Sequence, residues 1–93
     1  MEEIKIQLLN HELDALDRLF DRETSVIDAY AITFATAHAL RTDPLFTLLN
    51  EAAMALDKIV RAGLSNLAAH EAALDVTNEL RIRIAELVPS LTY

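Results

Sequence analysis

The sequence predicts an all-α fold, an up-and-down antiparallel four-helix bundle that forms one domain over residues 1–93. Ala and Leu dominate the composition, whereas Gly occurs once and Pro twice. Apolar residues recur at spacings of three and four, which is typical of helices, and β-branched residues form no alternating run. Residues 2–6 do alternate and could form a short extended arm, but a helix is preferred there. Short polar breaks separate the helical segments, and short connections favour antiparallel neighbours.

The first helix is expected over residues 4–20. Its apolar face is formed by residues at spacings of four, three and four, with Ile6 one turn earlier: Leu9, Leu13, Leu16 and Phe20. A polar break follows at residues 21–24, and Ser25 is a good N-cap with Asp28 three residues later. The second helix is expected over residues 26–40. Its inward residues are predicted to be Ile27, Tyr30, Phe34 and Ala37.

The start of the third helix has a strong signal, because Asp43 precedes Pro44 and proline is well suited to the first helical position. This helix is expected over residues 44–62, and Gly63 is a natural residue to end it. Its apolar stripe comprises Leu45, Leu48, Leu49, Ala52, Leu56, Ile59 and Val60.

The last third of the chain leaves one alternative open, because residues 64–74 could form a connector or the first turns of a longer helix. Asp75 is a plausible cap for a final helix over residues 76–88, which Pro89 is expected to end. The apolar stripe of this helix comprises Val76, Leu80, Ile84, Leu87 and Leu91.

Composition and charge narrow the function. The chain has no cysteine, which excludes disulfides and thiolate chemistry, and its fifteen acids against eight bases give a net charge of −7. This charge disfavours direct nucleic-acid binding and favours a positively charged partner. The longest stretch without charge, residues 29–40, is too short to cross a membrane. The N-terminus is acidic where a signal peptide is basic, so a cytoplasmic location is expected.

The three histidines, His11, His38 and His70, do not match metal-binding patterns. Neither His-Glu pair has a second histidine four residues after the first, as zinc proteases require, and no histidine has a glutamate three residues before it. We expect His11 and His70 at the surface and His38 partly buried. One glycine cannot build a phosphate-binding loop. The sequence therefore predicts a protein without catalytic residues, cofactor or metal, although a small metal-binding or enzymatic bundle is an alternative.

Acidic residues are concentrated in the first third of the chain. Asp14, Asp17 and Asp21 are spaced to lie on one flank of the first helix, and Glu23 and Asp28 continue the negative charge through the following turn. One interpretation is a solvated helix face that keeps the protein soluble. The other is a docking surface for a basic cleft, which would be steered to it electrostatically.

Several segments resemble the bacterial self-protective, colicin-like immunity proteins. The similar segments are Leu16-x-x-Leu19-Phe20, Thr24-Ser25-Val26-x-Asp28-Ala29, Asp43-Pro44-Leu45-Phe46-x-x-Leu49-Asn50, Leu56-Asp57-x-Ile59, and Leu74-Asp75 with Leu80-Arg81-x-Arg83-Ile84. The sequence departs from the family at Arg22 or Glu23, where a glycine is usual, and at Tyr30, where an aromatic residue is displaced. The resemblance implies a non-catalytic helical bundle that covers the active site of a cognate nuclease toxin, which in the colicin D branch cleaves tRNA.

The leading hypothesis is therefore an inhibitor of the immunity or antitoxin type. Its partner would be a nuclease domain with a basic cleft, and the residues expected to bind it are Asp14, Asp17, Asp21, Glu23 and Asp28. An acidic nucleic-acid mimic that inhibits another nuclease is a close alternative. A further alternative is a structural bundle that packs against a second copy through residues 64–74 and an alanine stripe. That stripe comprises Ala29, Ala31, Ala35, Ala37 and Ala39.

Overall fold

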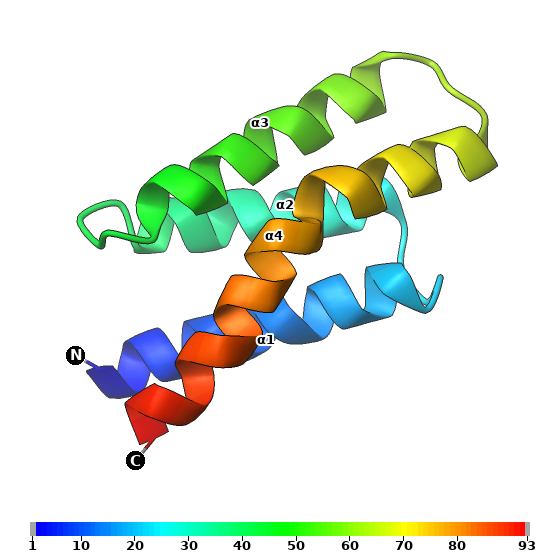
Figure 1. The fold of residues 1–93 in the computed structure, drawn as a ribbon. Coiled ribbons are helices and arrows are strands. Elements are labelled where there is room, and N and C mark those ends of the chain that lie inside the picture. Colours follow the sequence, from blue (N-terminus) through cyan, green and yellow to red (C-terminus); the bar gives the residue numbers. More distant parts are fainter. Residues whose placement is uncertain (1, 93) are drawn as a thin grey trace.

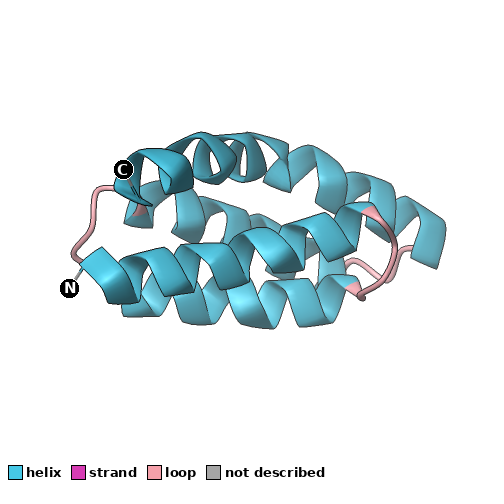
Figure 2. Ribbon diagram, turned by 90° about the horizontal axis from the view of Figure 1, so that it is seen from below, coloured by secondary structure: helices cyan, strands magenta, loops and turns pink. Residues whose placement is uncertain are grey.

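The computed structural model describes residues 2–92, and the side chains of residues 3–90 among them (Figure 1). It contains four helices: α1 (Glu2–Phe20), α2 (Val26–Ala39), α3 (Phe46–Arg61) and α4 (Asn66–Thr92). Each helix packs against the next along the chain, and α4 returns to pack against α1. Figures 1 and 2 show the resulting antiparallel arrangement, with α4 running obliquely across the others in Figure 1. The predicted all-α four-helix bundle is confirmed.

The core consists of two apolar clusters between these helices. The larger cluster joins all four helices through Leu9, Leu16, Ala37, Leu40, Leu45, Leu49, Ala52, Leu80 and Ile84. The smaller cluster lies nearer the α1–α2 turn and comprises Leu19, Ala29, Leu56 and Ala73. Burying a leucine or isoleucine side chain of this kind contributes about 1.5–3 kcal/mol. The packing of these side chains, rather than helix propensity alone, holds the four helices together.

The predicted bounds of the first helix are nearly those of α1, but one inward residue was wrong. Leu9 and Leu16 are buried as expected, whereas Phe20 is 53% exposed and Leu19 is buried in its place. The guanidinium of Arg81, from α4, lies over the Phe20 ring at 4.5 Å from its centroid. A cation and an aromatic face attract each other, so the ring is held at the surface of the bundle.

Helix α2 starts as predicted, but two of its four predicted inward residues are exposed. The Ser25 hydroxyl accepts a hydrogen bond from the Asp28 N–H at 3.2 Å, which confirms the N-cap. Ala37 is buried and Tyr30 is half-buried as predicted, whereas Ile27 and Phe34 are 57% and 54% exposed. The other buried residues are Ala29, Thr33 and Thr36. Apolar residues lie on all sides of α2, so periodicity could not select the buried face; small side chains there let its neighbours approach closely.

Helix α3 begins two residues later than predicted. Asp43 does accept a backbone hydrogen bond, but from the Leu45 N–H at 2.9 Å, and this turn holds Pro44 just before the helix. The apolar stripe is inward at Leu45, Leu49, Ala52 and Leu56, whereas Val60 is 37% exposed. Gly63 ends the α3 region with a positive φ of 69°, as its predicted role requires.

Helix α4 is longer than predicted at both ends. Residues 66–74 are helical, and the Ser65 hydroxyl accepts a hydrogen bond from the Ala68 N–H, so Ser65 takes the capping role assigned to Asp75. Asp75 and Val76 are exposed within the helix. The helix also continues past Pro89. A proline lacks the N–H that would donate to the carbonyl four residues earlier, so it removes one helix hydrogen bond, and only three residues of α4 follow it. The side chain of Leu91 lies outside the described residues.

Candidate protein-binding surfaces

The predicted acidic row consists of Asp14, Asp17 and Asp21 and lies on the outer face of α1. Asp14 is exposed and contacts Arg18, one turn later, at 3.1 Å. Both of these side chains are 59% exposed. Ion pairs with this exposure contribute little to stability because water screens them. Asp14 therefore remains accessible to a partner.

Asp17 differs from the other acids because it joins two helices. Its Oδ1 accepts a hydrogen bond from Nε of Arg81 in α4 at 2.7 Å, and the same guanidinium covers the Phe20 ring. The two residues of the pair are 64 positions apart, so no local sequence pattern indicates their contact. Asp17 thus has a positioning role between α1 and α4 besides its place in the acidic row.

The last three predicted acids lie at the α1–α2 turn. Asp21, Glu23 and Asp28 are all exposed, and no ion pair among residues 2–92 includes any of them. The structure therefore divides the five predicted residues. Asp14 and Asp17 form ion pairs with arginines, whereas the other three carboxylates, near one end of the bundle, have no ion-pair partner among the described residues.

The turn that carries these acids has a defined backbone. Glu23 N–H donates to the Arg18 carbonyl at 2.7 Å, and Arg22 N–H donates to the Leu19 carbonyl at 3.2 Å. This pair of bonds is a Schellman motif, which requires a left-handed residue after the helix. Arg22 is that residue, with φ of 62°. Glycine is usual at such positions, so an arginine here strains the backbone.

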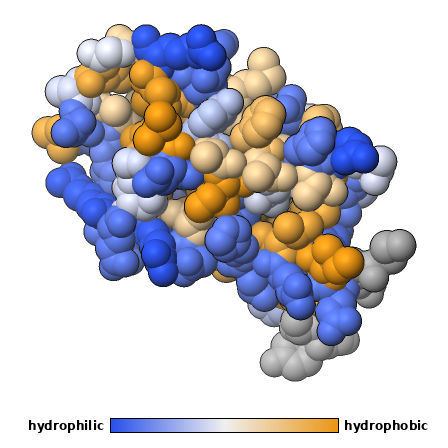
Figure 3. Space-filling model, turned by 180° about the vertical axis from the view of Figure 1, so that it is seen from behind, coloured by the Kyte–Doolittle hydropathy of each residue, from blue (hydrophilic) through white to orange (hydrophobic). Residues whose placement is uncertain are grey.

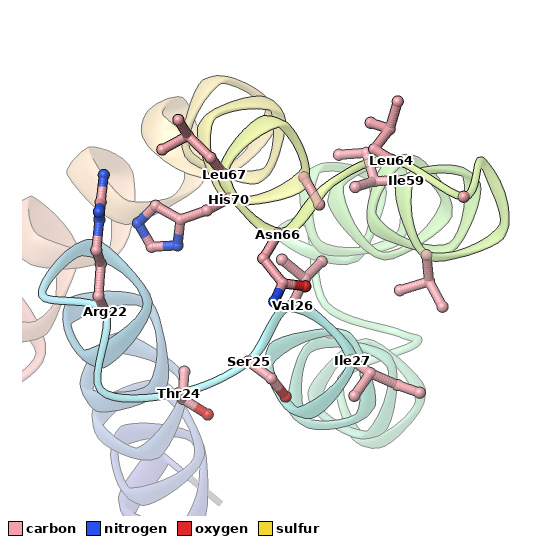
Figure 4. A pocket seen from close by; sticks show the side chains of 13 residues that line it. Arg22, Thr24, Ser25, Val26, Ile27, Ile59, Leu64, Asn66, Leu67 and His70 are labelled. Carbon is pink, nitrogen blue, oxygen red and sulfur yellow. The ribbon is translucent and has the colours of Figure 1, made fainter.

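An open cavity of about 560 Å³ lies beside this turn. Figure 4 shows that it is framed by the α1–α2 turn, the end of α3 and the first turns of α4. Ile27, Leu64 and Leu67 give it exposed apolar walls. Arg22 and His70 contribute its charged and polar side chains, and Nε2 of His70 is buried without a hydrogen-bond partner. Two histidine predictions are therefore wrong. His70, expected at the surface, is half-buried, and His38, expected to be partly buried, is exposed.

The outer face of α2 is another unusual surface. We define the α2 outer face by the exposed residues Ile27, Ala31, Phe34, Ala35 and His38. No charged residue occurs between Asp28 and Arg41. Figure 3, which shows the molecule from behind, has apolar side chains gathered in patches among the polar ones. Exposed apolar patches of this kind mark interaction surfaces more often than chance.

A buried carboxyl group lies between α1 and α2. Glu12 is 0% exposed, and its Oε2 accepts a hydrogen bond from the Thr33 hydroxyl at 2.6 Å. Its Oε1 is buried without a partner. Burial raises the pKa of Glu12 to about 6, although the threonine hydrogen bonding lowers it in part. Sequence reasoning missed this residue, although its spacing from Leu9 and Leu16 places it on the inward face.

The part of the chain that the structure describes contains no cluster of three or more His, Cys, Asp or Glu side chains that could hold a metal ion. Likewise, none of the four helices, as described, is long and apolar enough to cross a membrane.

Comparison with known proteins gives no match to a protein-family model, a curated protein or a solved structure. The similarity to colicin-like immunity proteins therefore rests on the sequence segments alone, and the assignment to that family stays a prediction.

Proposed function

We propose that this chain is an inhibitor of the immunity or antitoxin type, which binds a nuclease domain and covers its basic active-site cleft. The observation that carries the proposal is the position of Asp21 and Glu23. Both are exposed and without an ion pair among the described residues, where the acidic row of α1 reaches the apolar cavity. A cleft built to hold phosphates presents lysine and arginine side chains, which these carboxylates complement.

The surface combines the two components of a typical protein interface, an apolar centre and a polar rim. The cavity walls offer Ile27, Leu64 and Leu67 to an apolar side chain of the partner. The acids beside the cavity would steer the partner towards it, since long-range attraction between opposite charges accelerates association. Steric coverage then excludes the nucleic acid, and the inhibitor needs no catalytic group of its own.

The backbone supports this role because it holds the acids in place before a partner arrives. The Schellman motif fixes residues 18–23, and the Ser25 cap fixes the start of α2. Ordering a loop on binding reduces affinity, so a turn that is already ordered favours tight binding. The strained Arg22 lies in the middle of this turn. Backbone strain of this kind is often found at functional sites.

The test is a charge reversal with a matched control. The chain would be used to capture its partner from the native host, and the purified partner would then be assayed for cleavage of tRNA and DNA with added inhibitor. Asp21→Lys with Glu23→Lys should slow association at least tenfold at low salt, and the difference should shrink as salt rises. The control, Glu51→Lys with Glu71→Lys, makes the same change of charge at exposed sites on α3 and α4.

Three outcomes would contradict the proposal. The captured partner could lack nuclease activity, its nuclease activity could be unaffected by the bound chain, or the two double variants could slow association equally. The last result would show that net charge alone matters. Circular dichroism of each variant would establish that its helices are intact.

A further inference from the structure

The outer face of α2 is distinguished by its lack of charge, because residues 29–40 are the longest stretch of the sequence without a charged residue. Phe34 lies at its centre and is 54% exposed, with Ala31 and Ala35 exposed one turn before and one residue after it. Small side chains around one large side chain allow this face to pack closely against an identical face. A basic partner would find no carboxylate on this face to bind.

We propose that the α2 outer face binds a second copy of this chain, and that the two α2 helices run antiparallel about a twofold axis between Phe34 and Ala35. In such a contact both copies use the same surface, and each residue must therefore meet a suitable partner by symmetry. The proposal does not rest on the proposed inhibitory function, although Ile27 and Asp28 at the start of α2 are shared by the two surfaces.

The axis position follows from the place of Phe34 at the centre of the face. A twofold axis perpendicular to the helices keeps each residue on its own side of the contact. With the axis between residues 34 and 35, the two Phe34 rings lie about one residue apart along the helices, where they can stack on each other. The two Ala35 side chains meet on the other side of the contact, where their small size allows the helices to approach closely.

Charge supports the same arrangement. Asp28 and Arg41 lie at the two ends of the face, and among the described residues neither takes part in an ion pair. Asp28 lies in the first turn of α2, and Arg41 lies in the turn that follows the last helical residue, Ala39. An antiparallel pair brings Asp28 of one copy to the same end of the contact as Arg41 of the second, at both ends. A parallel pair would instead set like charges level with each other, which is unfavourable.

The contact also has a consequence for the predicted binding residues. If Asp28 faces the second copy, the acids left for a basic partner are Asp14, Asp17, Asp21 and Glu23. The dimer would then present two acidic surfaces, one for each copy. A stable interface needs about 1,200 Å² of buried surface in total, which one pair of short helices approaches only with flanking residues such as Tyr30.

The first experiment measures mass in solution by sedimentation over a range of concentrations. The natural chain should reach twice its 10.4 kDa monomer mass, and Phe34→Glu should remain monomeric at the same concentrations. Ile82→Glu is the matched control, because Ile82 is 49% exposed on α4, away from the proposed contact. Circular dichroism would verify that both variants fold. A monomeric natural chain, or equal dimerisation of the two variants, would overturn the proposal.

The second experiment tests the register, which the absence of native cysteines makes simple. A disulfide forms only when two Cβ atoms come to about 4 Å, so a single cysteine bonds to its copy only near the twofold axis. Ala35→Cys should form a covalent dimer with oxidised glutathione. Ala39→Cys, exposed one turn later on the same helix, should not. The opposite pattern, or equal crosslinking of both, would contradict the proposed axis.

Discussion

Helices α1 and α2 are antiparallel neighbours that distribute their side chains in opposite ways. The outer face of α1 carries Asp14, Asp17 and Asp21, and its inner face is rich in leucine. The outer face of α2 carries Ile27 and Phe34, whereas small alanines and threonines lie inside. The comparison shows that the inner face of α1 is its most hydrophobic face, whereas the inner face of α2 is the one with the smallest side chains.

The reason lies in what α2 must contact. It packs between α1 and α3, and Thr33 must reach the Glu12 carboxyl at 2.6 Å. A phenylalanine in that position would separate the helices and leave the carboxyl without its hydrogen bond. The large apolar side chains Ile27 and Phe34 instead lie on the outside of the helix, where they are exposed.

The largest expected effect tests this division within α2 itself. Ala29 is 0% exposed and Ala31 is exposed, although they lie two residues apart on the same helix. Ala29→Leu should lower the free energy of unfolding by roughly 3 kcal/mol, because the core has no space for three more carbon atoms. Ala31→Leu should change it by less than about 0.5 kcal/mol. Urea denaturation measures the free energy of unfolding of both variants. Similar decreases for the two would show that both faces of α2 are packed against other residues, which would contradict the assigned inner face.

Much of this fold could be predicted because its signals are local. Ser25 and Gly63 marked helix boundaries through a hydrogen bond to a nearby backbone group and through a positive φ, and these depend on a few adjacent residues. Asp43 marked the turn before α3, but the helix begins at Phe46 and not at Pro44. The inward face of α2 could not be predicted in full, since it depends on the space left by α1 and α3. The continuation of α4 past Pro89 was missed because proline was expected to end the helix, whereas it removes one hydrogen bond and only three residues follow it.

The candidate site was predictable to the same extent. Spacing placed Asp14, Asp17 and Asp21 on one outer flank of α1, where the structure has them. The Asp17–Arg81 contact and the cavity beside the turn join segments far apart in the chain, so no local pattern indicates them. The charge-reversal experiment tests whether these acids bind a partner.

The next effect concerns the inner faces of α1 and α2 and depends on pH. The pKa of Glu12 rises from its ordinary 4.5 to about 6 on folding, so the folded protein binds this proton more tightly than the unfolded chain. The free energy of unfolding from this group is therefore highest below pH 4.5 and falls by about 2 kcal/mol as the pH rises through 6. Denaturant titrations between pH 4.5 and 8 measure this dependence.

Glu12→Gln is the control, because it keeps the shape of the side chain and removes its titration. The stability of this variant should not show the fall between pH 4.5 and 6, and a fall equal to that of the natural chain would exclude Glu12 as its source.

Asp43 affects stability at lower pH than Glu12 does. Burial tends to raise the pKa of Asp43, but Lys5 and the Leu45 N–H hold this pKa below its ordinary 3.8. Its contribution is complete above pH 3.8 and is lost as the pH falls further.

The smallest effect compares the ends of two helices that use different residues for the same conformation. Arg22 after α1 and Gly63 after α3 have φ of 62° and 69°, and no atom lies within 4 Å of a Cβ added to Gly63. A non-glycine residue in this region costs about 1 kcal/mol, so Arg22→Gly should stabilise the chain by up to that amount and Gly63→Ala should destabilise it similarly. Thermal unfolding of the two variants measures both shifts. If Arg22→Gly instead loses stability, the arginine side chain itself stabilises the turn; if it gains stability but weakens partner binding, the strain at Arg22 is retained for the interface.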